Sequence, residues 1–239
     1  YEESSGKLTR VTKEAFSTGS AHLSPDGKQL LFTGQSYTVK RKNKSGVYVY
    51  DRETGRTTEL LKPRTYDLYD ALWWGEKILL LATDGKRYGL NENAQFYTLN
   101  PASGEVALLA PYEDALGSSV GSDCRLGGGR EWVQEGDKLY FVTTLGGASQ
   151  VYCLEEAGEI RPVYTQAGSV DCIDAAEGSL YFVGMQDGKL QELYRWDCRA
   201  QERDQLTTLN EKVLAGRYVA LPQALPYEND GVDLEGWVL

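Results

Sequence analysis

Histidine is almost absent from this chain, which has His22 alone among 239 residues. A single imidazole cannot supply a metal-binding histidine cluster, so we expect neither a metal nor a cofactor. Long apolar runs are missing too: no stretch of about 18 apolar residues could span a bilayer as a helix. The first residues, Tyr1 to Ser5, lack the charged and then apolar layout of a secretory signal peptide. These absences favour a cytoplasmic protein that does not bind a membrane.

Basic residues are in deficit, with 25 Lys and Arg against 35 Asp and Glu, a net charge of −10. Nucleic-acid phosphates need a basic face, so this balance argues against a nucleic-acid partner. The one basic cluster, Lys40-Arg41-Lys42-Asn43-Lys44, is predicted to be a solvated hairpin tip. The acidic pairs Glu113-Asp114 and Glu155-Glu156 are predicted to lie in solvated loops.

Cysteines are few and dispersed, at positions 124, 153, 172 and 198, with no Cys-x-x-Cys pair. Neither a zinc site nor a small disulfide framework fits this spacing. We therefore expect four unpaired, buried or half-buried thiols in a reducing compartment.

Turn signals, in contrast, are abundant and recur in register. In Ser24-Pro25-Asp26-Gly27-Lys28 the Asp-Gly pair favours a tight hairpin, because Gly adopts the positive φ that such turns need. An apolar run follows each of four turn glycines, roughly 40–60 residues apart. These runs are Leu30-Leu31-Phe32, Ile78-Leu79-Leu80, Leu139-Tyr140-Phe141 and Leu180-Tyr181-Phe182.

Two further strands are predicted after each run. The third strands contain aromatics: 47–50, 96–99, 151–154 and 193–196. The last strands are 57–60, 106–109, 160–163 and 205–208. Four strands per repeat of this length are typical of a β-propeller blade. We predict an all-β, partial β-propeller with four complete four-stranded blades, at 13–62, 66–110, 117–166 and 168–209, plus flanking strands. Residues 6–12 are expected to be the outermost strand of a preceding blade, and an unrelated meander of hairpins is the alternative.

The end of the chain departs from the repeat. Residues 218–226 contain Pro222 and Pro226, which do not suit a central strand, and residues 227–239 read as an extended segment. We predict a propeller domain over 1–222 and a linker over 223–239.

The turn Ser24-Pro25-Asp26-Gly27-Lys28 resembles the blade motif of prolyl-oligopeptidase-like serine peptidases and of TolB-like proteins. Residues Asp230-Gly231-Val232-Asp233-Leu234-Glu235-Gly236-Trp237-Val238-Leu239 resemble the junction at which those peptidases pass from the propeller into the α/β-hydrolase domain, and the acylaminoacyl peptidase branch is the most similar. The resemblance implies a propeller that screens short peptide substrates by size while a hydrolase domain absent from this chain performs the chemistry. Family propellers commonly have about seven or eight blades, which differs from the four visible here.

Two other functions compete with this one. The first is a free-standing, TolB-like propeller that binds a protein or ligand, for which the Gly236-Trp237-Val238-Leu239 tail has no use. The second is a polysaccharide-lyase propeller. It would need a metal-binding cluster of histidines, which a single histidine cannot supply. The sequence does not identify substrate-binding residues, and a homo-oligomer is possible in either case.

One motif mimics a catalytic site. Gly117-Ser118-Ser119-Val120-Gly121 matches G-x-S-x-G, but that motif works only on a sharp turn between a buried strand and a helix. Residues 112–116 do not read as a buried strand, and Gly127-Gly128-Gly129 does not propagate a helix or, without a following Lys, hold a phosphate. His22 precedes Ser119, the reverse of the hydrolase order. We predict that the chain has no catalytic residues and that His22 is packed or lines the channel.

The ends of a partial propeller should expose apolar blade faces. We predict one uncovered face bearing Leu30, Phe32, Val47 and Val49, and another bearing Leu180, Phe182, Leu193 and Trp196. Covering these faces favours either a smaller closed ring or two chains that meet end to end.

Overall fold

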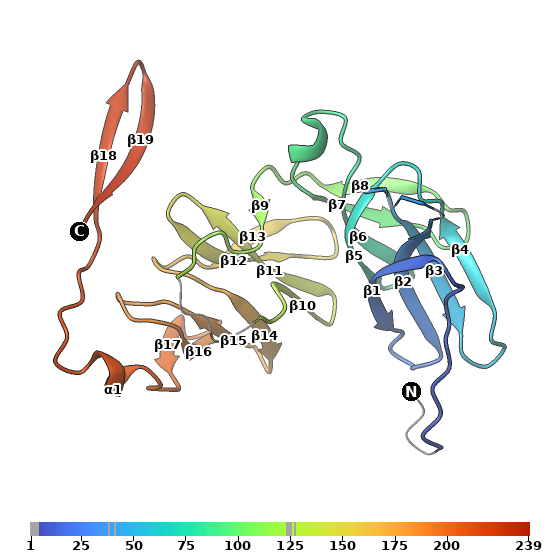
Figure 1. Cartoon of the computed structure of the whole chain (residues 1–239), viewed down its shortest axis with the longest axis horizontal. Helices are drawn as coiled ribbons and strands as arrows, with labels where there is room; N and C mark the ends of the chain where they lie inside the picture. Colours follow the sequence, from blue (N-terminus) through green and yellow to red (C-terminus); the bar gives the residue numbers. More distant parts are fainter. Residues whose placement is uncertain (1–4, 38, 41, 123–125, 127) are drawn as a thin grey trace. The chain divides into compact units, whose positions relative to one another are not determined.

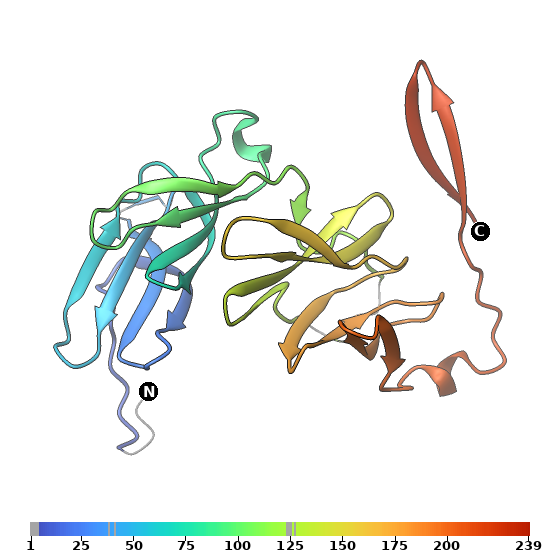
Figure 2. The same cartoon turned by 180° about the vertical axis from the view of Figure 1, so that it is seen from behind.

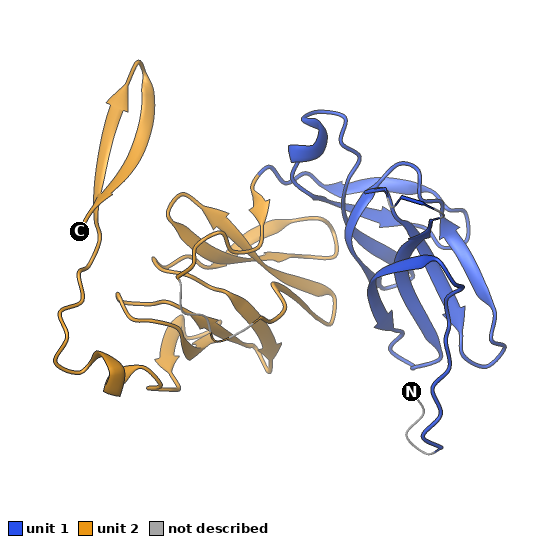
Figure 3. Ribbon diagram, in the orientation of Figure 1, with its two compact units in different colours: residues 1–113 blue, residues 114–239 orange. Residues whose placement is uncertain are grey.

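The computed structural model describes residues 5–37, 39–40, 42–122, 126 and 128–239. The chain divides into two compact units, residues 1–113 and 114–239 (Figure 3). Sheets dominate both units, and the four strands of each large sheet lie side by side in chain order (Figure 1, Figure 2).

Unit 1 contains two four-stranded antiparallel sheets. Blade 1 has the order β1-β2-β3-β4 and blade 2 the order β5-β6-β7-β8. The strands are β1 (Phe16–Leu23), β2 (Gln29–Ser36), β3 (Gly46–Asp51), β4 (Thr57–Leu61), β5 (Asp67–Trp74), β6 (Lys77–Thr83), β7 (Gln95–Leu99) and β8 (Val106–Ala110), with a short 3-10 helix η1 (Gly89–Asn91) between β6 and β7.

Unit 2 contains two more sheets of the same kind, blade 3 with the order β10-β11-β12-β13 and blade 4 with the order β14-β15-β16-β17. The strands are β10 (Trp132–Glu135), β11 (Lys138–Leu145), β12 (Ala148–Leu154), β13 (Ile160–Tyr164), β14 (Cys172–Ala176), β15 (Ser179–Gly184), β16 (Glu192–Asp197) and β17 (Glu202–Gln205). A two-residue strand β9 (Ala115–Leu116) adds to β11. The four predicted four-stranded repeats are confirmed.

The predicted hairpin turn is built from its own side chains. Ser24 Oγ donates to Asp26 Oδ1 (2.6 Å), and the amide of Gln29 donates to Ser24 Oγ (2.9 Å). Gly27 has φ +69°, a conformation that L side chains adopt only with strain. The hydrogen bond from Ser24, followed by the one from the Lys28 amide, lowers the pKa of Asp26.

Neighbouring blades pack front to back within each unit. We call the face that a blade turns toward the next blade along the chain its front face, and the opposite face its back face. The front face of blade 1 thus packs on the back face of blade 2, and the front face of blade 3 on the back face of blade 4. In unit 1 the front face of blade 1 supplies Leu31 and Val47, and the back face of blade 2 supplies Ile78 and Leu80, all fully buried. In unit 2 a larger cluster does the same. Its members include Tyr140, Val142, Val151 and Cys153 from blade 3, and Leu180, Phe182, Tyr194 and Trp196 from blade 4.

This packing corrects the predicted end faces. Leu31 pairs with Val49 and Thr33 with Val47 across the β2–β3 ladder, so both valines point forward into the contact with blade 2. Leu30 and Phe32 alone of that set lie on the back face of blade 1. In blade 4, Leu180, Phe182 and Trp196 point back toward blade 3, and Leu193 is the one residue of the predicted set on the front face.

Two predicted strands are also wrong. Residues 6–12 form no strand in the described part of the chain, where only an isolated bridge occurs at Lys7. The last strand of blade 4 is Glu202–Gln205 rather than 205–208. Asp197 Oδ1 accepts hydrogen bonds from the amides of Arg199 (3.0 Å) and Ala200 (2.9 Å), which tightens the turn, so the strand begins earlier.

The segment 223–239, predicted to be a single extended stretch, forms a hairpin. Strands β18 (Gln223–Asn229) and β19 (Val232–Val238) pair throughout (Figure 1). Asp230 (φ 52°) and Gly231 (φ 75°) form the two-residue turn, with positive φ at both positions as in a type I′ turn. Pro226 is tolerated because both strands of a two-stranded ribbon are edges. The short helix α1 (Glu211–Leu214) connects blade 4 with this region.

No helix in the described residues is both long and apolar enough to cross a membrane. The same residues contain no group of three or more His, Cys, Asp or Glu side chains placed to hold a metal ion.

Candidate functional site

Ser119 does not lie on a strand-turn-helix elbow. The strand before it, β9, has two residues, and residues 117–122 form neither helix nor strand. The amide of Ser119 donates to Thr144 Oγ1 (2.8 Å) on β11, and the side chain is exposed. Its neighbour Ser118 donates to the Val120 carbonyl (3.0 Å) and lies 2.9 Å from Ser149 Oγ. The local geometry is that of a loop fastened to the edge of blade 3.

His22 packs between the first strands of two blades. Its Nε2 lies 2.8 Å from Oδ1 of Asp70 on β5, and the carbonyl of His22 accepts a hydrogen bond from Trp73 Nε1 (3.3 Å). The side chain of Asp70 is 6% exposed and that of His22 is 23% exposed. His22 and Ser119 each have their partners within their own unit, and His22 serves as a contact between blades 1 and 2.

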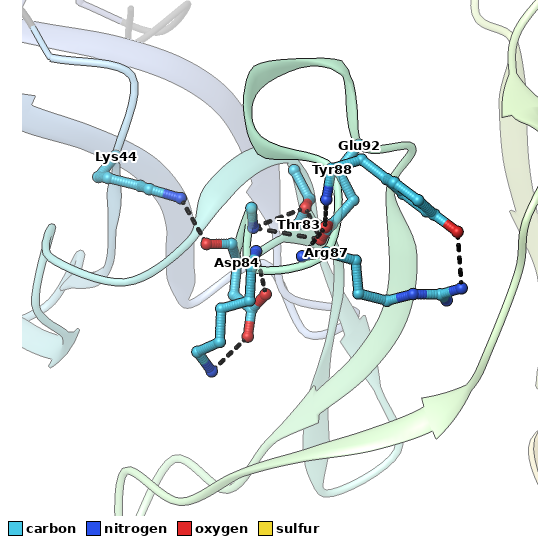
Figure 4. A network of polar contacts seen from close by, with 8 residues as sticks. Lys44, Thr83, Asp84, Arg87, Tyr88 and Glu92 are labelled. Carbon is cyan, nitrogen blue, oxygen red and sulfur yellow. Dashed lines mark hydrogen bonds and ion pairs between the residues drawn. The ribbon is translucent and has the colours of Figure 1, made fainter.

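A buried carboxylate organises the β6–β7 loop, residues 84–94 (Figure 4). Glu92 is 5% exposed and accepts four hydrogen bonds: from Thr83 Oγ1 (2.5 Å) and from the amides of Gly85 (3.2 Å), Arg87 (2.7 Å) and Tyr88 (3.0 Å). The bond from Thr83 is the largest cause of a pKa lowered to about 2. The three amide bonds add to it and outweigh burial, so the carboxylate stays charged and holds the loop in one conformation.

The tip of this loop presents side chains to solvent. Leu90 is 87% exposed and Tyr88 61% exposed. The Arg87 guanidinium lies 4.9 Å from the centre of the Tyr88 ring and pairs with Glu113 (2.5 Å). Glu113, predicted to be a solvated acid, is thus a surface ion-pair partner that fastens one side of the loop.

The β2–β3 loop reaches the same region of unit 1. Lys44 Nζ donates to the carbonyl of Asp84 (3.1 Å), which joins the two loops (Figure 4). Lys40 and Lys42 are exposed, as a solvated tip requires, and Lys44 is half-buried. Arg41 of the predicted basic cluster lies outside the described residues.

A polar cleft of about 490 Å³ lies beside this junction. Buried Gln35 forms its rigid wall, because its side-chain amide both accepts from the Lys42 amide (3.0 Å) and donates to the Lys42 carbonyl. Asp67 lines the cleft, and burial raises the pKa of its carboxyl while Lys44 opposes the rise. The remaining lining consists of Lys42, Gly19 and four residues with hydroxyl or amide side chains: Ser17, Thr18, Asn43 and Ser45. Such a surface can hydrogen-bond a peptide, and it contains no catalytic constellation among the described residues.

In unit 2, Arg203 of β17 links blades 3 and 4. Its guanidinium donates to Tyr164 Oη (2.9 Å), Gln166 Oε1 (3.0 Å), Gln186 Oε1 (2.6 Å) and Asp187 Oδ2 (2.5 Å). These bonds fasten the outer strands of the two blades to one another.

Glu192 anchors the segment that leaves blade 4. It accepts from Thr207 Oγ1 (2.6 Å) and from the amides of Leu209 (2.9 Å) and Asn210 (2.8 Å). Burial alone would raise the pKa of Glu192, but these hydrogen bonds outweigh it and lower the pKa. The chain that leads to α1 and the C-terminal hairpin is therefore fixed at its root.

The thiols match their prediction where they are described. Cys153, Cys172 and Cys198 are free, and burial is the main cause of the raised pKa of each, to about 11 for Cys153. Cys124 lies outside the described residues, as does Gly127 of the glycine run. A Cβ at Gly129 would collide with the Cys172 side chain, so this glycine has a packing role.

Sequence reasoning missed the two buried glutamates. Both accept hydrogen bonds from backbone amides that follow or precede them by up to 18 residues, and no short motif encodes such spacing. The nearest signal was a glutamate close to a predicted strand in each repeat, which is too common in an acidic chain to be informative.

No family model matches the chain. A curated relative is the uncharacterized peptidase YuxL of Bacillus subtilis (strain 168), which is 23% identical over an alignment of 243 positions that covers 98% of this chain and 37% of YuxL. Among solved structures, the acylaminoacyl peptidase of Pyrococcus horikoshii aligns with TM-score 0.67 and 20% identity over 94% of this chain and 32% of the peptidase. The chain thus spans about a third of the length of these two proteins.

Two further solved structures are similar. The β-propeller domain of the Trilobed protease from Pyrococcus furiosus aligns with TM-score 0.57 and 18% identity, over 83% of this chain and 56% of that domain. TolB from Acinetobacter baumannii aligns with TM-score 0.55 and 14% identity, over 95% of this chain and 53% of TolB. The chain has the fold of a peptidase propeller region. This confirms the predicted fold class and the resemblance at the level of the fold.

Proposed function

We propose that this chain is a non-catalytic, substrate-gating propeller domain of a cytoplasmic serine peptidase that hydrolyses short peptides, in the manner of acylaminoacyl peptidases. The similarity to about a third of a peptidase's length supports a domain that acts together with a hydrolase domain. The cleft beside the β2–β3 and β6–β7 loops offers hydrogen-bonding groups to a passing peptide.

The observation that carries the proposal is the C-terminal hairpin. Every residue of β18 and all but one of β19 are exposed, including Leu225 (54%), Tyr227 (53%), Val232 (57%) and Trp237 (51%). A two-stranded hairpin is marginally stable by itself, and so many exposed apolar side chains require a covering surface. A hydrolase domain that packs against this hairpin would cover these side chains.

The test uses the polypeptide encoded by the complete reading frame and a series of acyl-peptides of increasing length. Gating predicts hydrolysis rates that fall steeply with peptide length. It also predicts that Asp70→Ala, which removes the hydrogen bond between His22 and Asp70 and so loosens the contact between blades 1 and 2, flattens that fall without abolishing cleavage of the shortest peptide. Equal rates on short peptides and on unfolded proteins would contradict gating, and a reading frame without a hydrolase would contradict the parent enzyme.

The second candidate is a free-standing, TolB-like propeller that binds a protein or ligand. The alignment with TolB over 95% of the chain favours it. It predicts full stability and partner binding for the 239-residue chain alone, with no peptidase activity in the complete gene product.

A further inference from the structure

The polar cleft of unit 1 lies at one end of the contact between blades 1 and 2. Gln35 is on the front face of blade 1, because it follows the front-face residue Leu31 by four positions on the same strand. Asp67 is the first residue of β5 in blade 2, and just before it the Tyr66 carbonyl accepts a hydrogen bond from the Ser45 amide (3.0 Å). Both walls of the cleft therefore belong to blades of the same unit.

Unit 2 contains the same junction between blades 3 and 4. There the Ser149 amide donates to the Gly168 carbonyl (3.1 Å). Ser149 occupies the place of Ser45 in the repeat, because Val47 and Val151, two positions further on, pair in the same way. Each valine pairs with the residue that directly follows the apolar run of the preceding strand.

The residue of unit 2 that corresponds to Asp67 is Ser169. Asp67 pairs with Thr83 across the β5–β6 ladder, and the Ser169 amide donates to the Met185 carbonyl after β15 (2.8 Å). Thr83 and Met185 are each the third residue after the apolar run of their blade. The two junctions therefore share one plan, and their side chains can be compared position by position.

The side chains at the junction in unit 2 are satisfied by the protein itself. Ser149 Oγ accepts a hydrogen bond from the Val170 amide (2.8 Å) and lies 2.9 Å from Ser118 Oγ. Ser169 Oγ accepts a hydrogen bond from the Met185 amide (2.9 Å). Both Ser149 and Ser169 are 0% exposed, so this junction is closed.

The junction in unit 1 is open instead. Ser45 and Asp67 are half-buried and border the cleft of about 490 Å³. Within the described part of the chain, neither side chain has a hydrogen bond or an ion pair. Burial raises the pKa of Asp67 and the charge of Lys44 opposes the rise, but Lys44 Nζ donates to the Asp84 carbonyl (3.1 Å, Figure 4). A carboxylate that is partly desolvated and gains no donor is costly, so Asp67 is the group that a ligand would satisfy.

The surroundings of Asp67 indicate a cationic ligand with several N–H donors. Thr18, Asn43 and Ser45 place hydroxyl and amide groups in the same cleft, and their oxygens can accept the hydrogen bonds that the carboxylate does not take. The described lining contains no large apolar side chain, so an aliphatic group gains little there. The net charge of −10 attracts cations from a distance. An ammonium or a guanidinium group meets these requirements.

We propose that this cleft binds the positively charged side chain of a lysine or arginine in an N-acylated peptide, and that Asp67 determines this specificity. The peptide part of the inference rests on the proposed function, whereas the cation site rests on the geometry of unit 1. A blocked amino terminus leaves a side chain as the positive charge that such a substrate can offer. Asp67 thus gives the domain a preference among peptides that are short enough to pass.

The experiment measures peptide binding to the 239-residue chain itself, so it needs no hydrolase domain. The probes are N-acetylated, C-amidated alanine pentapeptides with lysine, arginine, norleucine or glutamate at the centre, and amide NMR spectra follow each titration. An alanine pentapeptide with a free amino terminus tests a terminal ammonium as the source of the charge. Asp67→Asn removes the carboxylate charge of the cleft. The matched control is Glu76→Gln, an equal change of charge at an exposed position beyond the other end of β5.

We expect the lysine and arginine peptides to shift the amide signals of Thr18 and Ser45. They should bind at least about tenfold more tightly than the norleucine and glutamate peptides, because a charge-assisted hydrogen bond is lost with either of these. Asp67→Asn should remove this preference, and Glu76→Gln should change the dissociation constants by less than about twofold. Because Asp67 has no partner to lose in the described chain, Asp67→Asn should not lower the melting temperature, whereas a purely structural role would lower it.

Equal binding of the lysine and norleucine peptides, or a preference that survives Asp67→Asn, would overturn the proposal and leave gating by length untouched. Tighter binding of the peptide with a free amino terminus would overturn the assignment to a side chain. A reading frame without a hydrolase would contradict the parent enzyme but not the cation site, so the two proposals fail separately. Should Asp67→Asn not fold, Asp67→Ser takes its place, because serine is the residue at the equivalent position of unit 2.

Discussion

His22 Nε2 and Asp70 Oδ1, which are 48 residues apart in sequence, lie 2.8 Å from each other and join the first strands of blades 1 and 2. The carboxylate also accepts from the Ala71 amide (2.7 Å). The sole histidine of the chain therefore links two repeats by a side-chain hydrogen bond beside their apolar contact.

This pair leads to a stability prediction. His22→Ala removes a partner of a carboxylate that is 6% exposed, and a buried acceptor that loses a hydrogen bond costs about 1–3 kcal/mol. We expect the free energy of unfolding to fall by that amount in urea titrations at pH 7. His22→Gln, which keeps a donor, should recover at least half of the loss. Equal losses for Ala and Gln would show that the hydrogen bond is unimportant.

The Glu92 network predicts a pH dependence. The pKa of Glu92 falls from 4.5 to about 2, so its contribution to stability is fully present above about pH 4.5 and is lost as the pH falls toward 2. Glu92→Gln should lower the free energy of unfolding by about 2–4 kcal/mol at pH 7. The difference in free energy of unfolding between the unsubstituted chain and Glu92→Gln should become smaller as the pH falls from 4.5 to 2. Glu113→Gln, a matched change at an exposed surface ion pair, should shift stability by less than about 1 kcal/mol. A gap that is constant across this pH range would contradict the role given to the Glu92 charge.

The thiols predict a difference in reactivity between the folded and unfolded chain. Burial raises the pKa of Cys153 to about 11, so its thiolate is about a hundredfold scarcer at pH 8 than in an unfolded chain. We expect slow modification of Cys153 by a disulfide reagent in the native protein. Denatured, unreduced protein should give four thiols per chain. A count of two or zero would contradict the prediction of unpaired cysteines.

Ser119 is predicted to be chemically ordinary. Its loop lacks a helix after the serine, and its main partner is Thr144, so nothing activates the hydroxyl among the described residues. A fluorophosphonate probe should leave the isolated chain unlabelled, and Ser119→Ala should not change its melting curve. Labelling at Ser119 would overturn this reading of the motif.

Local patterns predicted the blades well and their contacts poorly. The Ser24–Lys28 turn and the alternating apolar runs depend on neighbours in sequence, so the predicted strand bounds lie within a few residues of the observed ones. Val47 can lie on the same face as Leu31 or on the same face as Leu30, depending on the pairing register of β2 and β3. The conformation of the loop between the two strands sets this register. A shift of one residue moves every side chain of a strand to the other face. The sequence does not indicate this register, and the predicted end faces therefore combined residues of the front face with residues of the back face.

The functional region shows the same limit. Asp-Gly was recognised as a turn at positions 26–27 but not at 230–231, because Pro222 and Pro226 argued against strands. Prolines exclude a central strand and permit an edge, and only the pairing showed that β18 and β19 are both edges. The partners of Glu92 and Glu192 depend on loop conformation, which no periodicity describes.

The domain boundary gives the last prediction, that residues 1–222 fold without the hairpin. The strands of blade 4 end at Gln205, and Glu192 fixes the exit segment through Thr207, Leu209 and Asn210, all of which a truncation after Pro222 retains. The hairpin touches the rest of unit 2 lightly: a Cβ at Gly147 would collide with the Trp237 ring, yet Trp237 is 51% exposed. Because so little apolar surface is shared, we expect the melting temperature of 1–222 to lie within about 3 °C of the full chain.

The matched variant Trp237→Ala should behave in the same way, whereas truncation after Gln205, which removes the donors to Glu192, should lower the melting temperature by more than about 5 °C. Aggregation or unfolding of 1–222 together with loss of stability in Trp237→Ala would show that the hairpin is part of the propeller's own core.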